Sequence, residues 1–394
     1  MQMRQTPYYL YDTELLHRTL EAVQTEIGKY NNYVVHYAIK ANANPMLLPI
    51  IQRAGLGADC VSGGEIEAAV KAGFHPSKIV FAGVGKSDWE IRTALHNDIF
   101  CFNVESEPEL EVINQIAAQM RKSAGVCLRI NPEVGAHTHA HITTGTAENK
   151  FGIALCEVER VICMAQQMDH IRLRGLHFHI GSQILDMNDF VELAHRINEI
   201  QEQLQQKGIT FDTINVGGGL GVDYDNPHAT PIPDFKSYFA VFHEHLRQRP
   251  GQSIHFELGR SIVAQCGSLI TRVLYIKQGT DRQFAIVDAG MTELIRPALY
   301  GAHHRIESIT ADPATLQLTS TLPFSTADDD LQAYDVVGPI CESTDVFAHN
   351  IRLPRLQRGH ILAIRSAGAY GETMASQYNL RPLPKSYDLC STEI

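Results

Sequence analysis

Several residues that can do covalent or acid–base chemistry follow apolar segments of the sequence. Lys40 ends the run VVHYAIKA, His177 and His179 lie in LRGLHFHIG, and Glu257 lies in SIHFELGR. A lysine amine can form a Schiff base, and a carboxylate can hold the protonated nitrogen of a pyridine ring. The three glycines at 217–219 can offer backbone N–H groups to a phosphate. An amine, an anion nest and a carboxylate together indicate pyridoxal phosphate.

Each of these features also has an ordinary structural explanation. A lysine at a strand end is usually solvated, and three glycines usually form a tight turn because glycine tolerates positive φ. Glu257 and Arg260 in ELGR could form a local ion pair, and we expect one of the two histidines of HFH to be a packing residue. The chemical interpretation is favoured because the predicted fold brings all of these residues to one place.

The fold prediction is based on a repeating pattern from about residue 34 to residue 260. Apolar, β-branched runs alternate with amphipathic helical segments such as EPELEVINQIAAQM. Eight such runs favour a closed (β/α)8 barrel over an open doubly wound sheet, and the active site of a barrel lies at the C-terminal strand ends. The runs are VVHYAIKA, LGADCVS, KIVFAG, IFCFNVES, GVCLRIN, LRGLHFHIG, DTINVGGGL and SIHFELGR.

The pattern changes after the last of these runs. Short strand-like segments separated by turns, with little helical signal, predict a separate antiparallel β domain. They are SLITRVLYIKQ, DRQFAIVDAG, ATLQLTSTL at 314–322, AYDVVGPICES and GHILAIRSAGAYG. The segment YYLYD near the N-terminus could add either a strand or an arm to it. We therefore predict a barrel over residues 25–270 and a β domain built from residues 1–24 and 271–394.

Composition limits the class of protein. A formal net charge of -11 argues against a nucleic-acid or anionic-membrane partner. The 8 cysteines are scattered without a C-x-x-C pair, which is typical of reduced thiols in the cytoplasm. No signal peptide and no run of about 20 apolar residues is seen. We expect a cytoplasmic enzyme that acts on a small molecule.

Seven motifs together resemble the fold-type III pyridoxal-phosphate decarboxylases, and most of all the diaminopimelate decarboxylase family. They are YAIKANANP, VSGGE, GLHFHIGSQ, NVGGGLG, ELGR, GPICES and AGAYGETMASQYNLRP. The match extends to about Arg381 with the motifs in the same order. The resemblance implies an alanine racemase/ornithine decarboxylase-like fold and a homodimer with shared active sites. It also implies decarboxylation of meso-2,6-diaminopimelate to L-lysine, the last step of lysine biosynthesis.

The resemblance implies roles for the residues that match these motifs. Lys40 would bind pyridoxal 5'-phosphate covalently, His179 would stack on its ring, and Glu257 would pair with its pyridine nitrogen. The remaining cofactor-binding residues, near the phosphate, would be Ser182, Gly217, Gly218, Gly219, Gly259, Arg260 and Tyr370.

The catalytic set implied by the resemblance is completed from the partner subunit. Cys341 would handle a proton beside the cofactor, alongside Lys40 and His179, and Glu342 would meet the substrate amine. A thiol with an ordinary pKa of about 8.5 can give or take a proton near neutrality.

Substrate choice depends on the segment DAGMTELIRPALYGAHH. In the resembling enzymes its Arg296 and Tyr300, with Arg260, grip a distal carboxylate, which a guanidinium can bind bidentately. Ornithine and lysine decarboxylases of this fold need an acidic group for a distal ammonium instead. The substrate-binding residues implied here are Arg260, Arg296, Tyr300, Glu342 and Tyr370.

Two features of the sequence lie outside this pattern. The family usually has CESGD where this chain has CESTD, and Thr344 would be disfavoured if the position needs positive φ. The loop at 143–153 fits the family, but the alternating His137, His139 and His141 before it are a weak metal signal, and we predict no metal site.

Three alternatives compete with the leading interpretation. One is a decarboxylase for another amino acid, such as ornithine, lysine or a D-amino acid. Alanine racemase shares the architecture but lacks the GPICES motif. A pyridoxal-phosphate carrier without turnover would resemble the barrel alone, whereas this chain also has the β domain with Cys341 and Tyr370.

Overall fold

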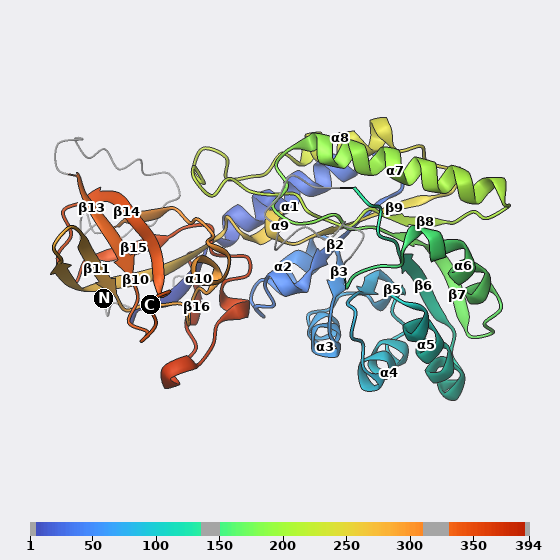
Figure 1. The fold of residues 1–394 in the computed structure, drawn as a ribbon, viewed down its shortest axis with the longest axis horizontal. Coiled ribbons are helices and arrows are strands. Elements are labelled where there is room, and N and C mark those ends of the chain that lie inside the picture. The colour runs from blue at the N-terminus through green and yellow to red at the C-terminus, as the bar shows by residue number, and fades with distance from the viewer. Residues whose placement is uncertain (1–4, 135–149, 310–330, 391–394) are drawn as a thin grey trace. The chain divides into compact units, whose positions relative to one another are not determined.

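The fold is described from a computed structural model, which describes residues 5–134, 150–309 and 331–390 (Figure 1). Contacts between residues divide the chain into two compact units. The barrel unit consists of Thr19–Gly221 and Asp234–Ile262. The sheet unit consists of Met1–Arg18, Val222–Pro233 and Val263–Ile394.

The barrel unit contains a closed barrel of parallel strands in sequence order, which confirms the predicted (β/α)8 fold. The last strand closes on the first through pairs such as Val35 with Phe256. Each predicted run overlaps one of the strands, but every strand is shorter than its run, and β2, β6 and β7 begin one or two residues before it. The strands are β2 (Tyr33–Ala38), β3 (Gly57–Cys60), β4 (Ile79–Phe81), β5 (Cys101–Val104), β6 (Ala124–Arg129), β7 (Ile171–His177), β8 (Thr213–Asn215) and β9 (Ser253–Leu258).

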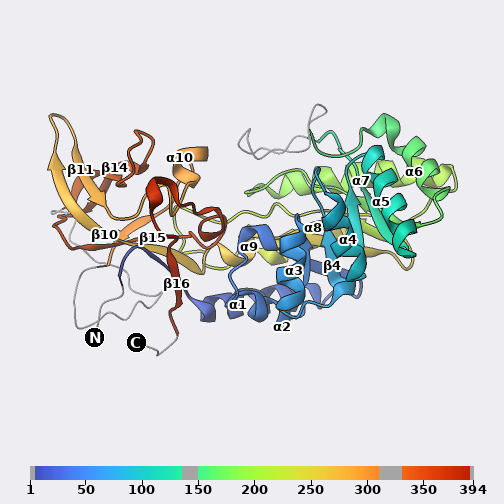
Figure 2. The same cartoon turned by 90° about the horizontal axis from the view of Figure 1, so that it is seen from below.

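Helices lie on the outside of this barrel, and α3, α4 and α5 lie side by side there in both views (Figures 1 and 2). Ser62 Oγ accepts the N–H of Glu65 at the start of α3, and Ser106 Oγ accepts that of Glu109 at the start of α5. The helices are α1 (Thr13–Ile27), α2 (Leu48–Arg53), α3 (Gly63–Lys71), α4 (Asp88–His96), α5 (Glu107–Met120), α6 (Val158–Gln166), α7 (Met187–Gln206) and α8 (Phe235–His245).

Alternation along β9 explains how polar groups enter the barrel. Phe256 points outward, where its ring lies 4.9 Å from that of Phe239 and 5.4 Å from that of Phe242 on α8. Its neighbours His255 and Glu257 therefore point inward, because successive side chains of a strand face opposite sides. Packing of the aromatic residues against α8 thus fixes the register that places Glu257 in the barrel interior.

In the residues that the structure describes, the sheet unit contains an eight-stranded sheet with a central order of β12-β15-β10-β11-β13-β14, and β1 pairs with β10 and β16. This sheet confirms the predicted fold class, in which a barrel is joined to a mostly antiparallel β domain. The pairing is mostly antiparallel, but β11 with β13 and β1 with β16 are parallel. The strands are β1 (Tyr8–Tyr11), β10 (Gly267–Gln278), β11 (Gln283–Val287), β12 (Ile306–Ser308), β13 (Leu331–Val337), β14 (Val346–Pro354), β15 (Ile361–Ile364) and β16 (Lys385–Asp388).

Three of these strands were not predicted. β12 has three residues, β16 carries Lys385 and Asp388, and β14 contains a bend at Asn350, whose φ is 50°. Short length and interspersed polar residues weaken the period-2 pattern on which strand prediction depends. The strand predicted at 314–322 lies outside the described residues.

Short helices complete the fold. They are α9 (Arg260–Val263), α10 (Arg296–Tyr300) and the 3₁₀ turns η1 (Ile39–Ala41), η2 (Pro76–Lys78), η3 (Leu155–Glu157), η5 (Glu372–Met374) and η6 (Tyr378–Leu380). Among the helices that the structure describes, none has the length and apolar character needed to cross a membrane.

Candidate active site

Lys40 lies directly after β2, in the 3₁₀ turn η1. The buried Tyr37 hydroxyl donates to the carbonyl oxygen of Asn42 at 2.9 Å, which holds this turn against the end of the strand. The Lys40 side chain is 40% exposed, and its Nζ lies 3.2 Å from Asp59 Oδ2. The amine is therefore both held by a carboxylate and reachable by a small molecule.

Asp59 on β3 is a site residue that sequence reasoning missed. Its side chain is fully buried, and its Oδ1 has no hydrogen-bond partner. Burial, and then the negative charge of Glu257, raise the pKa of the Asp59 carboxyl to about 7, against the opposing effect of Lys40. This carboxyl can therefore exchange a proton near neutral pH.

Glu257 is enclosed by donors from three other strands. Asn103 Nδ2 and Asn215 Nδ2 donate to Oε1 at 2.9 and 2.8 Å, and His177 Nε2 lies 3.0 Å from Oε2. Burial alone would raise the pKa of the carboxyl, but the charge and hydrogen bond of His177, and then Lys40, hold that pKa below its usual range. Glu257 is therefore ionised, and His177 is more than a packing residue.

His179 follows the end of β7. The N–H of Gly218 donates to its Nδ1 at 3.3 Å, so the ring carries its proton on Nε2 when it is neutral. Burial, with the positive charges of Arg129 and Lys40, lowers the pKa of His179 well below its ordinary value. A neutral, flat and half-buried imidazole therefore lies just after β7, close enough to Lys40 and Glu257 to feel their charges.

The glycine turn at 217–219 requires glycine for conformation and for space. Gly217 and Gly219 have φ of 74° and 120°, and a Cβ on Gly218 would lie 1.8 Å from the carbonyl oxygen of Glu257. The N–H of Gly217 donates to Asn215 Oδ1 at 2.9 Å. Since Gly218 donates to His179, two amides of this turn are used within the chain.

Arg260 and Ser182 form a further contact at the barrel's C-terminal strand ends. Arg260 begins α9 directly after Gly259, is buried, and donates from Nη2 to Ser182 Oγ at 3.1 Å. Nine of the predicted residues belong to the barrel unit: Lys40, His179, Ser182, Gly217, Gly218, Gly219, Glu257, Gly259 and Arg260.

The other predicted residues belong to the sheet unit, where Arg296 is the most restrained. It is buried, and its Nη1 lies 3.0 Å from the Tyr224 hydroxyl and 2.9 Å from His304 Nε2. Tyr300 ends the same short helix, α10, and is half-buried. Tyr370 is also half-buried and occupies a turn with φ of 56°.

Cys341 and Glu342 are exposed on a loop of the sheet unit. The Tyr378 hydroxyl donates to Glu342 Oε1 at 2.6 Å, and the N–H of Cys341 lies 3.5 Å from Asn379 Oδ1. Thr344 stands where the family usually has glycine, in CESTD instead of CESGD. It does not have positive φ, so threonine fits the backbone at this position.

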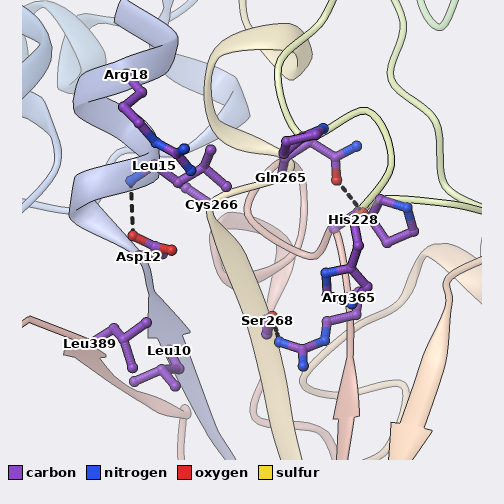
Figure 3. Close-up of a pocket in the computed structure, with 13 residues that line it drawn as sticks. Leu10, Asp12, Leu15, Arg18, His228, Gln265, Cys266, Ser268, Arg365 and Leu389 are labelled. Atoms are coloured by element: carbon purple, nitrogen blue, oxygen red, sulfur yellow. Dashed lines mark hydrogen bonds between the residues drawn. The ribbon is translucent and has the colours of Figure 1, made fainter. Parts of the chain in front are cut away.

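A separate cavity of about 160 Å³ lies in the sheet unit (Figure 3). Its polar groups bond to one another: Arg365 Nη1 donates to Ser268 Oγ at 3.3 Å, and the N–H of Leu15 donates to Asp12 Oδ1 at 2.8 Å. It contains none of the predicted site residues.

The weak metal signal at His137, His139 and His141 lies outside the described residues. In the described part of the chain, no group of three potential metal ligands is found.

Comparison with known proteins bears on this site. Residues 14–264 match the family described as "Pyridoxal-dependent decarboxylase, pyridoxal binding domain". The chain is 60% identical over 383 residues to a diaminopimelate decarboxylase of Bacteroides thetaiotaomicron, with 97% of this chain and 95% of that protein covered.

Solved structures agree. Diaminopimelate decarboxylase from Helicobacter pylori complexed with L-lysine superposes with a TM-score of 0.89 at 40% identity, over 98% of this chain and 92% of that chain. The enzyme from M. jannaschii in complex with L-lysine gives a TM-score of 0.84 at 31% identity, with 97% and 87% covered.

Proposed function

Because the chain belongs to the diaminopimelate decarboxylase family, whose members depend on pyridoxal phosphate, we infer that it converts meso-2,6-diaminopimelate to L-lysine and carbon dioxide. It is then a carboxy-lyase that performs the last step of lysine biosynthesis. The observation that carries this inference is 60% identity over nearly the whole of both chains to a relative with that activity.

The residues of the barrel unit fit pyridoxal phosphate. Lys40 offers a partly exposed amine, Glu257 a buried carboxylate, and residues 217–219 a turn with no room for side chains. When bound, pyridoxal phosphate withdraws electrons from the α-carbon of the substrate and so makes the bond to its carboxylate labile. Lys40, His179, Ser182, Gly217, Gly218, Gly219, Glu257, Gly259, Arg260 and Tyr370 are the residues we assign to holding it.

The side chains of this unit have distinct tasks in that arrangement. Glu257 holds a negative charge against the pyridine nitrogen, and the neutral imidazole of His179 covers a ring face. Asp59, whose pKa is raised to about 7, can accept a proton from Lys40 Nζ or return it at 3.2 Å. The amine can thus be freed for covalent attachment at neutral pH.

A homodimer with shared sites is part of the proposal. Cys341 and Glu342 are exposed in the single chain, which suits residues that act in a partner's site. The β domain proposed over residues 1–24 and 271–394 would contribute to that interface. Cys341 would hold or deliver a proton at Sγ, and Glu342 would receive the substrate amine.

Arg296, Tyr300 and Arg260 are the residues we assign to the distal carboxylate of the substrate, with Tyr370 near the phosphate. The buried guanidinium of Arg296 contacts Tyr224 and His304, which hold its planar fork in one orientation. A carboxylate at Glu342 and a guanidinium at Arg296 together suit a substrate tail that carries both an amine and a carboxylate. Ornithine and lysine lack that carboxylate and could not make this contact with Arg296.

The first test is release of carbon dioxide from purified protein with pyridoxal phosphate. We expect release from meso-diaminopimelate and none from L-lysine, L-ornithine or L-arginine. Release from ornithine or lysine instead would preserve the cofactor assignment and refute the assigned substrate.

A second test addresses covalent attachment. Lys40→Ala should abolish both turnover and the adduct that borohydride reduction leaves on the protein, as read by mass spectrometry. Lys29→Ala, which removes an exposed lysine paired with Glu26, is the control and should retain both. A reducible adduct that persists in Lys40→Ala would show that another lysine is used.

We also place the reaction in the cytoplasm. All eight cysteines are free, and the sulfur atoms of Cys101 and Cys127 lie 3.7 Å apart without forming a bond. Unpaired thiols are typical of a reducing compartment. Apart from the second subunit, the only partner proposed is the amino-acid substrate.

A further inference from the structure

Three side chains donate hydrogen bonds to the buried carboxylate of Glu257. We propose that Asn103, Asn215 and His177 are positioning residues that keep this carboxylate ionised and leave one acceptor direction open for the pyridine N–H of the cofactor. The proposal rests on the proposed function and deepens it, because it names residues that control the electronic state of the cofactor.

The hydrogen-bond geometry supports a single open direction. A carboxylate offers about four lone-pair sites, two on each oxygen. Oε1 accepts from Asn103 Nδ2 at 2.9 Å and from Asn215 Nδ2 at 2.8 Å, so both of its sites are used. Oε2 accepts from His177 Nε2 at 3.0 Å, which leaves one site. A ring N–H that approaches Glu257 therefore has one acceptor to meet, on Oε2.

The orientation of Asn215 is itself fixed by the glycine turn. Its Oδ1 accepts the N–H of Gly217 at 2.9 Å, and its Nδ2 must therefore face Glu257. One amide side chain thus links residues 217–219, assigned above to the phosphate, with the carboxylate assigned to the pyridine nitrogen. The two ends of the cofactor would be held by a single rigid connection.

His177 is explained better by this role than by packing. An ionised carboxylate only accepts, so Nε2 of His177 carries the proton that is shared with Glu257. Its other ring nitrogen, Nδ1, is buried and has no hydrogen-bond partner. Buried polar atoms without partners are uncommon in folded proteins, and an apolar side chain would fill the position at lower cost. The bond to Glu257 supplies a reason to keep a histidine there.

The sign of the effect follows from what each donor stabilises. Hydrogen bonds to the ionised form of a carboxyl favour that form, so removing a donor raises the pKa of Glu257. A protonated Glu257 would present a proton instead of an acceptor to the pyridine N–H. Loss of His177 should therefore weaken cofactor binding most at low pH and least at high pH.

The test is binding of pyridoxal phosphate to the apoprotein, measured by absorbance from pH 5.5 to pH 8.5. His177→Leu should raise the Kd at pH 5.5 by about tenfold or more relative to wild type, with the deficit shrinking toward pH 8.5. His177→Gln, which retains a donor, should restore most of the affinity. His75→Leu, at an exposed position, is the control and should match wild type.

A second variant keeps the test decisive if His177→Leu does not fold. Asn103→Leu removes one of the two donors to Oε1 and should give the same pH-dependent loss. A loss that is equal at every pH, or no loss in either variant, would overturn the positioning role while wild-type binding keeps the proposed function. Failure of wild-type apoprotein to bind pyridoxal phosphate would overturn both.

Discussion

The barrel unit and the sheet unit present their candidate site residues in opposite ways. In the barrel unit, Asp59 and Glu257 are buried, and Glu257 is enclosed by side chains from three other strands. In the sheet unit, Cys341 and Glu342 are open to solvent on a loop. A single chain therefore surrounds the proposed cofactor carboxylate, Glu257, with partners but leaves Cys341 and Glu342 exposed.

The contrast has a structural cause. Eight strands in a closed ring direct their inner side chains at one another, so each polar group meets partners from several strands. The loop that carries Cys341 is held mainly through Asp345, which accepts the N–H of Ile340 at 2.7 Å and that of Met291 at 2.6 Å. The bonds to Asp345 fix the loop backbone, but they leave the side chains of Cys341 and Glu342 exposed to solvent.

The largest expected effect comes from mixing two inactive variants. Lys40→Ala and Cys341→Ala should each lack turnover, because the proposed site takes one residue from each subunit. Random reassortment of a two-fold dimer should then restore about one quarter of the wild-type rate, with one intact site in each heterodimer. Lysine formation after subunit exchange is the measurement.

The control mixes Lys40→Ala with Glu257→Ala, two changes on the barrel unit. An intact site needs Lys40 and Glu257 from the same chain. In this mixture every chain lacks one of the two residues, so no heterodimer contains an intact site. Equal recovery in both mixtures, or none in the first despite demonstrated exchange, would refute the shared-site comparison.

Arg296 tests the buried part of the sheet unit. Arg296→Lys keeps the charge but loses the planar fork that Tyr224 and His304 hold, and it should raise the KM for meso-diaminopimelate by about 10–100-fold with a smaller change in kcat. Steady-state kinetics measure both. An unchanged KM with lowered thermal stability would assign Arg296 to the fold of the sheet unit alone.

Asp59 tests the buried part of the barrel unit through pH. Its pKa is raised to about 7 in the folded chain, so its stabilising contribution is greatest below pH 4 and is lost as pH rises toward 7. Asp59→Asn mimics the protonated form. The variant apoprotein should match wild type near pH 4 and exceed it at pH 8 by an amount on the order of a few kcal/mol.

Urea unfolding at the two pH values provides the measurement for Asp59→Asn. The same change in stability at both pH values would mean that Asp59 does not titrate between them. A variant less stable than wild type at pH 8 would mean that the ion pair with Lys40 outweighs the cost of burying the charge.

The smallest effect is expected at Thr344, beside the exposed loop. Because Thr344 does not have positive φ, glycine would relieve no strain there and would only add freedom to the unfolded chain. Thr344→Gly should lower the free energy of unfolding by about 0.5–1 kcal/mol and leave turnover unchanged. A gain in stability would show that the threonine is strained.

The strands and the residues that follow them could be predicted because both depend on local pattern. Lys40 was expected at the end of a strand and lies in the turn directly after β2. The weakly patterned β12, β14 and β16 could not be found in the same way, since pairing with stronger neighbours defines them.

The inner polar residues were missed for a different reason. Asp59, Asn103 and Asn215 each lie at or one residue before the end of a barrel strand, as does His177, which the sequence singled out without its bond to Glu257. A polar residue repeated at that position in otherwise apolar strands is a signal that could have been used. Its meaning depends on which strands face each other across the barrel, and local periodicity does not contain that information.

The sequence by itself determined the barrel, the second β domain, the family and the residue types available for chemistry. Local hydrophobic periodicity and motif order carry that information in consecutive residues. The tertiary structure alone decided that Glu257 is ionised among three donors, that Asp59 has its pKa raised to about 7, and that Cys341 is exposed. Charge state and burial depend on groups far apart in the chain, which only the closed strands and their turns bring within hydrogen-bond distance.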